Sequence, residues 1–528
     1  MAFLTLLQDS IRKFWNQTAL SDYKGDDFTY EDIAIIVRHY HKIFKENGIK
    51  RGDRISICGP NCARWGIAYL SAVTYGAVAV PILNDFMIDQ VQNIVNHSES
   101  RLLFAAQNIR GKLDVEQIPL VKKVLHIEDI HALKDETMQP EEVVYQPEDG
   151  PDALATLNYT SGTTGFSKGV MLPYRCCYSN WQFHRRVYRR VMKPNAELLT
   201  VLPMAHMYGL TCSFVAPFIQ GCHNTFLTRV PSPAIINQAF VELKPVLLIS
   251  VPLVIEKYVK YKIEPDISSL KKLHYIHYPI VGPIFKYLVR RRAIKYFGGN
   301  MTEVLVGGSA INKSVEEFLK NINFPLAVGY GATETGPMIT YENHKKIRKG
   351  SCGRAVVNME VKIDSPKPHE VAGEILTRGK NVMLGYYKNP SATAEAIDEE
   401  GWYHTGDLGI IDKDGFVYIM GRKKNMILGT NGQNIYPEEI EDRLNNMDYV
   451  AESIIVQRDE RLVALIYPNY EAAYANGLND EQIMEQMHTN RKELNATLPN
   501  YSQIARVELM DQEFEKTAKR SIKRFLYK

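Results

Sequence analysis

Apolar runs of strand length recur along the first two thirds of the chain and alternate with stretches of helical spacing. Gly52–Ile57 is a turn that leads into an apolar run, Trp65–Tyr75 has the pattern of a helix, and Gly76–Pro81 is again apolar. Similar apolar runs follow at Val246–Val251 and Glu303–Val306. Alternation of buried strands with helices is typical of a parallel sheet covered by helices. The pattern therefore predicts an α/β fold.

The pattern changes after about residue 352. Shorter β-like runs separated by turns appear at Val361–Ile363, Gly373–Thr377 and Gly415–Ile419, and this favours a small antiparallel or barrel-like unit. The polar segment Gly421–Asn425 follows the last of these runs. We expect a domain boundary there.

The C-terminal part of the chain has its own alternation of helices and strands. Helical patterns cover Pro437–Asn445 and Asp480–Ala496, and strand patterns cover Ser453–Gln457 and Leu462–Tyr467. These segments predict a compact α+β domain with a separate core.

With 528 residues, the chain is too long for one ordinary hydrophobic core. We expect an α/β protein with a large N-terminal domain (residues 1–421) of stacked α/β subdomains and a small β unit. A smaller, mobile α+β domain (residues 422–528) is expected to follow it.

Composition excludes several classes of protein. The hydrophobic content of 45% is ordinary for a soluble globular chain, and the net charge of +3 is too small to indicate a nucleic-acid binder. Seven cysteines without zinc-like spacing predict buried or free thiols. The N-terminus lacks the pattern of a signal peptide, and Leu210–Cys222 and Val246–Ile255 are shorter than the about 20 residues that span a bilayer. We expect a cytoplasmic protein.

The segment Tyr159–Val170 concentrates glycines, hydroxyl residues and one lysine between two apolar runs. Small residues let backbone amides approach an anion closely, hydroxyls add donors, and lysine adds a positive charge. The segment therefore predicts a phosphate-binding loop between two strands, with a flexible turn as the alternative. It is not the common P-loop, in which lysine precedes a hydroxyl residue, because here Ser167 precedes Lys168.

Four more motifs follow in order, at Leu202–Gly209, Val306–Ala310, Gly329–Gly336 and Trp402–Asp407. Together with the phosphate loop, they make the chain similar to the AMP-forming acyl-CoA synthetases of the adenylate-forming superfamily. That superfamily also contains firefly luciferase and the adenylation domains of peptide synthetases. The resemblance covers nearly the whole chain.

The resemblance implies that the loop binds the β- and γ-phosphates of ATP. The residues implied in this contact are Thr160, Ser161, Gly162, Thr163, Thr164, Gly165 and Lys168, and Thr164 is also an implied Mg²⁺ ligand. Ser167 stands where the family usually has proline. This difference removes a restriction on φ and adds a donor, so it need not damage the loop.

Adenine is implied to bind at two glycine-rich segments. Tyr330 offers a flat face for stacking, with Gly331 beside it, and Ser309 and Ala310 are implied to pack on the other side of the base. A plain glycine-rich turn is the alternative for each segment.

Catalytic roles are implied for three residues. Thr333 is expected to bond the α-phosphate, and Glu334 is a hard oxygen ligand that suits Mg²⁺ bridging phosphates. His206 is implied to shape the entry for the acyl carboxylate. A solvated loop glutamate and an ordinary core histidine are the respective alternatives.

Asp407 and Arg422 are implied to bind the ribose, because one carboxylate can accept bonds from both sugar hydroxyls. Lys424 stands at the family's hinge between the two domains. The loop beyond it is implied to bind CoA through Gly429, Gly432, Gln433 and Asn434.

The C-terminal end departs from the family pattern. Alignment on Ile522 and Arg524 puts Ser521 in the place of the lysine that normally contacts the acyl carboxylate and the α-phosphate. We take Lys519 as its substitute, with Lys516 and Lys523 as weaker candidates. A solvated basic tail is the alternative, and such a tail leaves open a weak contact with anionic lipid.

The implied activity is the ligation of a medium- or long-chain fatty acid to CoA, with ATP and Mg²⁺, through an acyl-AMP intermediate. An aryl acid is the second choice of substrate. An enzyme that loads a carrier-protein thiol and a non-catalytic nucleotide-binding protein are the alternatives. The oligomeric state stays open.

Overall fold

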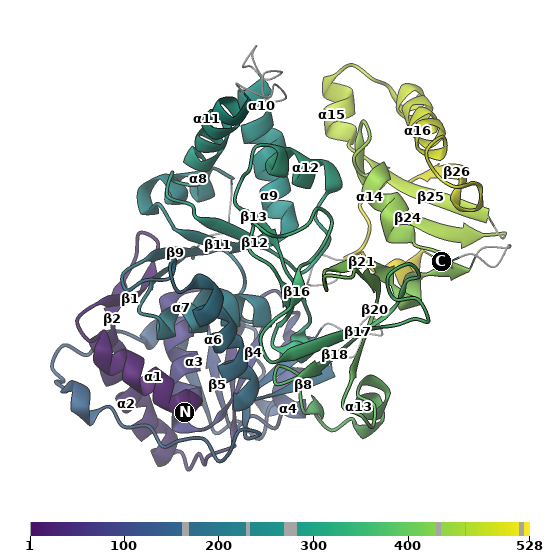
Figure 1. Cartoon of the computed structure of the whole chain (residues 1–528). Helices are drawn as coiled ribbons and strands as arrows, with labels where there is room; N and C mark the ends of the chain where they lie inside the picture. The colour runs from purple at the N-terminus through teal and green to yellow at the C-terminus, as the bar shows by residue number, and fades with distance from the viewer. Residues whose placement is uncertain are drawn as a thin grey trace.

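The computed structural model describes residues 2–160, 168–228, 233–268, 282–428, 434–459, 461–516 and 522–527. Figure 1 shows the large N-terminal part at the lower left and the smaller C-terminal domain at the upper right. No helix in the described ranges is long and apolar enough to cross a membrane.

One seven-stranded sheet forms the first subdomain, with the strand order β19-β8-β7-β4-β3-β5-β6. Strands β3, β4, β5, β6 and β7 pair in parallel, whereas β8 runs antiparallel to both β7 and β19. The bounds are β3 (Arg54–Cys58), β4 (Val78–Ile82), β5 (Leu102–Ala105), β6 (Lys123–His126), β7 (Leu154–Thr160), β8 (Lys168–Pro173) and β19 (Gly385–Tyr386).

A second seven-stranded sheet has the order β13-β12-β11-β9-β10-β1-β2, and all its pairs are parallel except β1–β2. The bounds are β1 (Thr18–Asp22), β2 (Asp27–Thr29), β9 (Glu197–Thr200), β10 (His223–Phe226), β11 (Leu247–Ser250), β12 (Glu303–Val306) and β13 (Leu326–Val328). These two sheets agree with the predicted stacked α/β subdomains.

Helices pack around both sheets (Figure 1). Their bounds are α1 (Phe3–Lys13), α2 (Tyr30–Glu46), α3 (Ala63–Tyr75), α4 (Ile88–His97), α5 (Gln107–Arg110), α6 (Tyr174–Tyr188), α7 (Ala216–Ile219), α8 (Pro233–Leu243), α9 (Pro252–Tyr258), α10 (Glu264–Ser268), α11 (Gly282–Lys295), α12 (Lys313–Asn321) and α13 (Pro390–Ala396). The π-helical segment Gly209–Val215 leads directly into α7, and a second one, Val259–Ile263, connects α9 to α10.

Local sequence explains where these helices begin and end. The Thr29 side chain accepts a bond from the Asp32 amide, and Asp32 bonds back to the Thr29 amide, so this capping box starts α2. Helix α3 stops at Gly76, which has a φ of 84° that only glycine adopts without strain.

The predicted small β unit is antiparallel. Four strands pair in the order β17-β18-β20-β21, and three shorter ones pair as β14-β15-β16. The bounds are β14 (Tyr330–Gly331), β15 (Met338–Tyr341), β16 (Arg354–Ala355), β17 (Met359–Asp364), β18 (Gly373–Gly379), β20 (Tyr403–Ile411) and β21 (Val417–Arg422). The predicted domain boundary after residue 421 falls at the last residue of β21.

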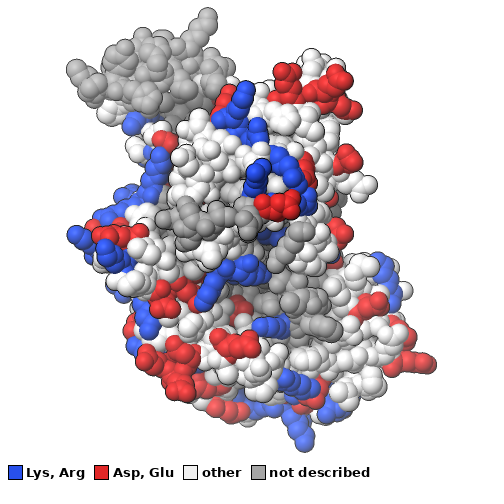
Figure 2. All heavy atoms as spheres, turned by 90° about the vertical axis from the view of Figure 1, so that its right-hand side faces the viewer, with Lys and Arg blue, Asp and Glu red and all other residues white. Residues whose placement is uncertain are grey.

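The C-terminal domain has an α+β fold with its own core. Strand β25 pairs antiparallel with β24 and parallel with β26. The bounds are β22 (Ile427–Leu428), β23 (Asn434–Ile435), α14 (Pro437–Leu444), β24 (Val450–Arg458), β25 (Arg461–Pro468), α15 (Tyr470–Ala475), α16 (Asp480–Asn495) and β26 (Ile504–Leu509). Figure 2 faces this side of the molecule, where acidic and basic side chains are both spread over the surface.

Helix α14 connects the C-terminal domain to the β unit and to α12. Asn312 just before α12 donates to Asn446 just after α14, and within the C-terminal domain the Asn425 side-chain amide donates to Glu438 at 2.6 Å. A Cβ added at Gly421 would lie 2.9 Å from a Glu438 oxygen, so β21 and α14 are in close contact.

Candidate active site

The predicted phosphate loop is carried by the β7–β8 hairpin. Thr160 at the end of β7 pairs with Lys168 at the start of β8, so the two strand ends stand opposite each other. Lys168 is exposed, and Thr160 is half-buried. The other predicted loop residues, Ser161, Gly162, Thr163, Thr164 and Gly165, lie outside the described residues.

Three predicted nucleotide-binding side chains form one connected cluster. Asp407 on β20 lies across from Arg422 on β21, and the Arg422 Nε lies 2.7 Å from Asp407 Oδ1. The Tyr330 hydroxyl donates to the other carboxylate oxygen of Asp407 at 2.6 Å. Asp407 is 9% exposed, whereas Arg422 is 53% exposed. The cluster therefore pairs a buried carboxylate with a cation that reaches the surface.

Burial dominates the electrostatics of this cluster. It raises the pKa of Asp407 above its usual value, although Arg422 and the Tyr330 hydroxyl oppose the shift. Burial and the nearby Asp407 charge raise the pKa of Tyr330 well above its usual value, so Tyr330 remains a neutral donor. The Tyr330 ring belongs to a small apolar cluster in the β unit, and stacking on adenine stays a prediction.

A tyrosine that the sequence reasoning missed connects two further predicted residues. The Tyr386 hydroxyl donates to Glu334 Oε1 at 2.9 Å, and the Lys168 Nζ lies 4.7 Å from the centre of the Tyr386 ring. An ammonium at that distance from an aromatic face is attracted by the ring. Tyr386 thus joins the predicted phosphate-binding lysine to the predicted metal ligand.

Tyr403 is a second residue that was missed. Tyr403 is buried, and burial together with the nearby Glu334, Tyr386, Tyr330 and Asp407 side chains raises its pKa well above the usual value. Tyr403 therefore lies between the Tyr330–Asp407–Arg422 cluster and the Lys168–Tyr386–Glu334 group. Its position two residues before Thr405, in the same motif as Asp407, is a sequence signal that was available. Tyr386 had no such signal, because its strand joins β8 from far along the chain.

Close backbone packing explains the glycines beside the cluster. A Cβ added at Gly331 would lie 1.8 Å from the Pro337 carbonyl, because β14 and β15 are paired there. Gly308 has a φ of 90°, and it turns the chain so that Ser309 and Ala310 are exposed. Thr333 and Glu334 follow in a short turn and are half-buried.

His206 lies where the chain enters a helix. Its carbonyl accepts a bond from the Leu210 amide at 2.8 Å, and the side chain is half-buried. The preceding Ala205 carbonyl accepts a bond from Asn158 on β7 at 2.9 Å. This segment is therefore fixed to the strand that leads into the phosphate loop, while the catalytic role of His206 stays a prediction.

The predicted hinge residue Lys424 lies in a short turn, Lys423–Asn425, directly after Arg422. Of the predicted CoA-binding residues, Asn434 is exposed in β23, and Gly429, Gly432 and Gln433 lie outside the described residues.

Two of the three candidate C-terminal lysines are engaged within their own domain. Lys516 pairs with Glu452 at 2.7 Å and with Glu513 at 3.0 Å, and Lys523 pairs with Glu515 at 3.1 Å. Lys519 and Ser521 lie outside the described residues.

The donor set of the site suits a magnesium ion held jointly with phosphates. Within the described ranges, no group of three or more His, Cys, Asp or Glu side chains forms a metal cage. Mg²⁺ is usually held by one or two carboxylates together with substrate phosphates, and Glu334 supplies one carboxylate of this kind.

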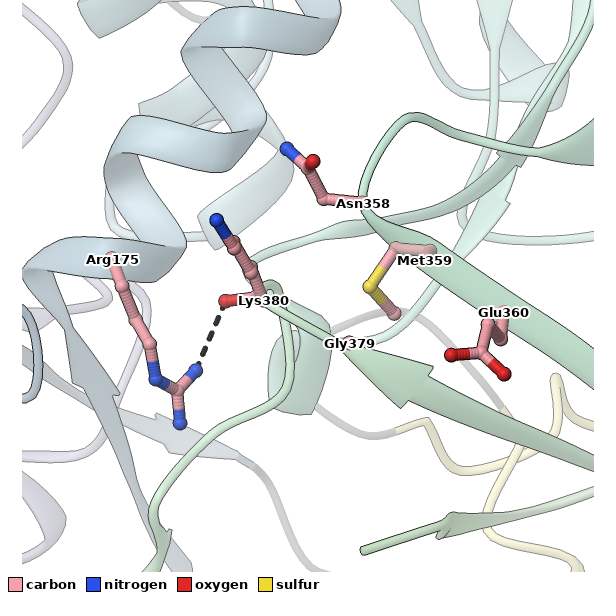
Figure 3. A pocket seen from close by; sticks show the side chains of 6 residues that line it. All are labelled: Arg175, Asn358, Met359, Glu360, Gly379 and Lys380. Atoms are coloured by element: carbon pink, nitrogen blue, oxygen red, sulfur yellow. Dashed lines mark hydrogen bonds between the residues drawn. The ribbon is translucent and has the colours of Figure 1, made fainter.

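A separate hollow of about 370 Å³ lies where α6 meets β17 and β18 (Figure 3). It is lined by Arg175, Asn358, Met359, Glu360, Gly379 and Lys380. Arg175 donates to the Lys380 carbonyl at 3.0 Å across its floor. None of the predicted site residues lines it.

Six cysteines are buried, Cys352 is half-buried, and all seven are free thiols. Burial raises the pKa of the thiols at Cys58 and Cys62 to about 12. The prediction of buried or free thiols is confirmed.

Curated relatives cover most of the chain. It is 28% identical over 484 residues to 4-coumarate–CoA ligase from Vanilla planifolia, covering 86% of this chain and 81% of that protein. It is also 28% identical over 482 residues to a long-chain-fatty-acid–CoA ligase from Salmonella typhimurium, covering 84% of this chain and 80% of that protein.

Solved structures share the fold. O-succinylbenzoate coenzyme A synthetase from Bacillus subtilis, in complex with ATP and magnesium ion, is 20% identical, with a TM-score of 0.77 and 98% of each chain covered. The family model described as AMP-binding enzyme matches residues 7–387, and the model described as AMP-binding enzyme C-terminal domain matches residues 424–527. The chain therefore belongs to the AMP-binding enzyme family.

Proposed function

We propose that this protein is an AMP-forming acid–CoA ligase that uses ATP, Mg²⁺ and CoA. In the first step, a carboxylate attacks the α-phosphate of ATP and gives acyl-AMP and pyrophosphate. In the second step, the CoA thiol attacks the mixed anhydride, the thioester forms and AMP leaves. One observation carries the proposal: in a chain that belongs to the AMP-binding enzyme family, five predicted nucleotide-site residues lie in two adjoining groups of contacts. These residues are Lys168, Glu334, Tyr330, Asp407 and Arg422.

Each residue of this junction has a chemical task in the proposed reaction. Asp407 accepts bonds from the ribose hydroxyls, and its burial strengthens those bonds because water does not compete. Lys168, with the amides of its loop, offsets the charge that develops on pyrophosphate. Glu334 would hold Mg²⁺, which supplies charge neutralisation at the phosphates. Thr333 bonds the α-phosphate.

A C-terminal lysine orients the acyl carboxylate toward the α-phosphate. Lys519 is our assignment, because Lys516 and Lys523 are already paired with carboxylates of their own domain. His206 shapes the entry for the carboxylate.

The second step uses the same chamber after the C-terminal domain rotates at Lys424. The loop from Gly429 to Asn434 then lines the path of CoA. A proline at Lys424 should slow thioester formation more than adenylation, because it restricts φ at the hinge. Equal loss of both steps, measured as thioester yield and as acyl-AMP formation, would count against the hinge.

The acyl group is proposed to be a medium- or long-chain fatty acid. The relatives include both a long-chain fatty acid ligase and a 4-coumarate ligase, so an aryl acid is the second candidate. Aromatic side chains between His206 and Tyr330 give no support for a fatty tunnel, because Phe214 and Phe218 are fully buried in the main core and Tyr287 is 51% exposed. The substrate class therefore rests on resemblance alone.

A panel of carboxylic acids with measurement of AMP release tests this proposal. Medium- and long-chain fatty acids should release AMP fastest, and CoA should raise the rate by resolving acyl-AMP. Release with an acid but no response to CoA would favour loading of a carrier-protein thiol. No acid-dependent release, combined with measurable ATP binding, would favour a non-catalytic nucleotide-binding protein.

A further inference from the structure

Helix α11 presents an apolar stripe to solvent. Ile284, Tyr287 and Leu288 are 61%, 51% and 52% exposed, and they follow the i, i+3, i+4 spacing of one helix face. Arg291 and Lys295 continue the same face at i+7 and i+11, and both are exposed. On the opposite side, Val289 and Ala293 are buried and fix the helix to the core.

A hollow of about 670 Å³ adjoins this stripe. It is lined by Asn237 and Val241 on α8, Asp266 on α10, Leu288, Arg291, Arg292 and Lys295 on α11, and Tyr296. Val241 is 53% exposed, so α8 extends the apolar surface. We call the exposed residues of the stripe, together with this hollow, the α11 face.

The charge of the α11 face is positive. Arg292 holds Asp266 with two bonds of 2.5 Å, which neutralises the one carboxylate of the hollow. Between Gly282 and Lys295 the sequence has Lys286, Arg290, Arg291, Arg292 and Lys295 and no Asp or Glu. Within the described ranges, no ion pair forms at Arg291 or Lys295.

We propose that the α11 face docks on an anionic membrane surface. Ile284, Tyr287 and Leu288 would enter the boundary between headgroups and acyl chains, and Arg291 and Lys295 would meet lipid phosphates. The exposed apolar side chains lie beside basic ones on a single face, and burial of apolar area together with attraction to anionic lipid is what holds a protein surface in this boundary. Juxtamembrane Lys and Arg residues are attracted to anionic lipid in the same way.

A second copy of the chain fits the α11 face less well than an anionic membrane does. In a two-fold dimer the same face meets itself, so Arg291 and Lys295 of one copy would approach those of the other. The α11 segment offers no carboxylate to offset this repulsion.

The α11 face is also remote from the candidate active site. Figure 1 shows α8, α10 and α11 together at the top of the molecule, whereas β20 and β21 lie at its right. Substitutions on the face therefore leave the site's own residues in place. The docking proposal does not depend on the proposed reaction.

Vesicle co-sedimentation tests the docking. The full chain should bind vesicles of mixed phosphatidylcholine and phosphatidylglycerol, bind phosphatidylcholine alone much less, and lose binding as salt rises. Leu288→Glu removes part of the apolar stripe, and the double variant Arg291→Glu/Lys295→Glu reverses two charges. The double variant should weaken binding to the anionic vesicles at least about tenfold, since one basic side chain is worth about fivefold. Leu288→Glu should also weaken binding about tenfold, because an apolar side chain no longer enters the boundary.

Matched controls separate this face from general effects of charge and hydrophobicity. Val144→Glu changes a residue that is 72% exposed elsewhere, and Lys112→Glu reverses an exposed charge elsewhere. Both should bind like the wild type, and thermal unfolding should be unchanged in all variants.

Three results would overturn the proposal. Wild-type protein that ignores anionic vesicles is the first, and variants of the face that bind as well as the wild type are the second. The third is a wild-type dimer that Leu288→Glu dissociates, without any binding to vesicles, because the face would then be an interface between copies.

Discussion

Two carboxylate–arginine pairs, one at the candidate active site and one in the C-terminal domain, differ in how many hydrogen bonds they make and in how exposed the arginine is. One oxygen of Asp407 contacts the Arg422 Nε at 2.7 Å, and its other oxygen accepts a bond from the Tyr330 hydroxyl. In contrast, both carboxylate oxygens of Glu441 on α14 accept bonds from Arg524, at 2.6 and 2.7 Å. Glu441 also accepts a bond of 2.6 Å from the Ile455 amide.

The difference lies in what each pair leaves exposed. Arg524 is 21% exposed and also donates to the Ile455 carbonyl, so the C-terminal pair is a closed unit that fixes the tail to α14 and β24. Arg422 is 53% exposed, so the active-site pair has a cation that still reaches solvent. We therefore assign a structural role to the closed pair and propose a ligand-binding role for the open one.

The largest expected effect concerns the closed pair. Glu441→Ala leaves the Arg524 charge largely buried without its partner, so it should lower the stability of the C-terminal domain by about 3–5 kcal/mol. Chemical denaturation followed in this domain measures the loss. Arg506→Ala, which removes an exposed pair with Glu508 in the same domain, is the control and should shift the midpoint little. A Glu441→Ala protein as stable as the wild type would mean that the pair does not fix the tail.

The open pair should show the reverse behaviour. Asp407→Asn should reduce kcat/KM for ATP about 10²-fold or more, because each bond to a charged acceptor contributes about 1.5–3 kcal/mol. Its unfolding midpoint should stay close to that of the wild type.

Asp412→Asn is the matched control for Asp407. Asp412 lies at the other end of the same hairpin and pairs with Arg348 at 2.5 Å. Steady-state kinetics with varied ATP should show little change in this variant. If both variants lose activity equally, the hairpin rather than the carboxylate matters.

The tail that the closed pair fixes carries the candidate lysine. Lys519→Ala should slow acyl-AMP formation about 10²-fold, because a positive charge at the reacting carboxylate is lost. Lys516→Ala and Lys523→Ala remove lysines that already pair with carboxylates, and they should change the rate much less. Single-turnover measurement of acyl-AMP compares the three. A larger loss in Lys523→Ala would move the assignment to that residue.

The smallest effect is expected at Tyr386, which borders the open pair. Tyr386→Phe removes the bond to Glu334 but keeps the ring beside Lys168. It should weaken MgATP binding about tenfold, because the lost bond orients Glu334 and does not itself contact MgATP. Calorimetric titration with MgATP measures this without turnover.

The next residue provides the control. Tyr387→Phe removes a bond of 3.0 Å to Glu99, which is not among the residues of the site, and should leave MgATP affinity unchanged. Equal affinities for wild type and Tyr386→Phe would show that Tyr386 does not position Glu334.

Local patterns were sufficient to predict most elements. The helix expected at Trp65–Tyr75 is α3, and the strand expected at Glu303–Val306 is β12 with the same bounds. Hydrophobic spacing and glycine caps act over a few residues, so they are readable without a fold. The family resemblance likewise implied that Asp407 and Arg422 act on one ligand, and the two side chains are paired in the structure.

Contacts between distant segments were not predictable in this way. Tyr330 and Asp407 are 77 residues apart, and their bond depends on how β14 approaches β20. Tyr386 reaches Glu334 only because β19 joins the edge of the first sheet beside β8. The basic α11 face was also missed, since burial of Val289 and Ala293 decides which side of the helix meets solvent.

We propose that the open pair at Asp407 belongs to a site that adenylates a carboxylic acid. Exchange of labelled pyrophosphate into ATP measures that step directly. We expect exchange in the wild type that requires Mg²⁺ and a fatty acid but not CoA, and a loss of about 10²-fold in Asp407→Asn at unchanged stability. Absence of acid-dependent exchange in the wild type, or an unchanged rate in Asp407→Asn, would contradict it.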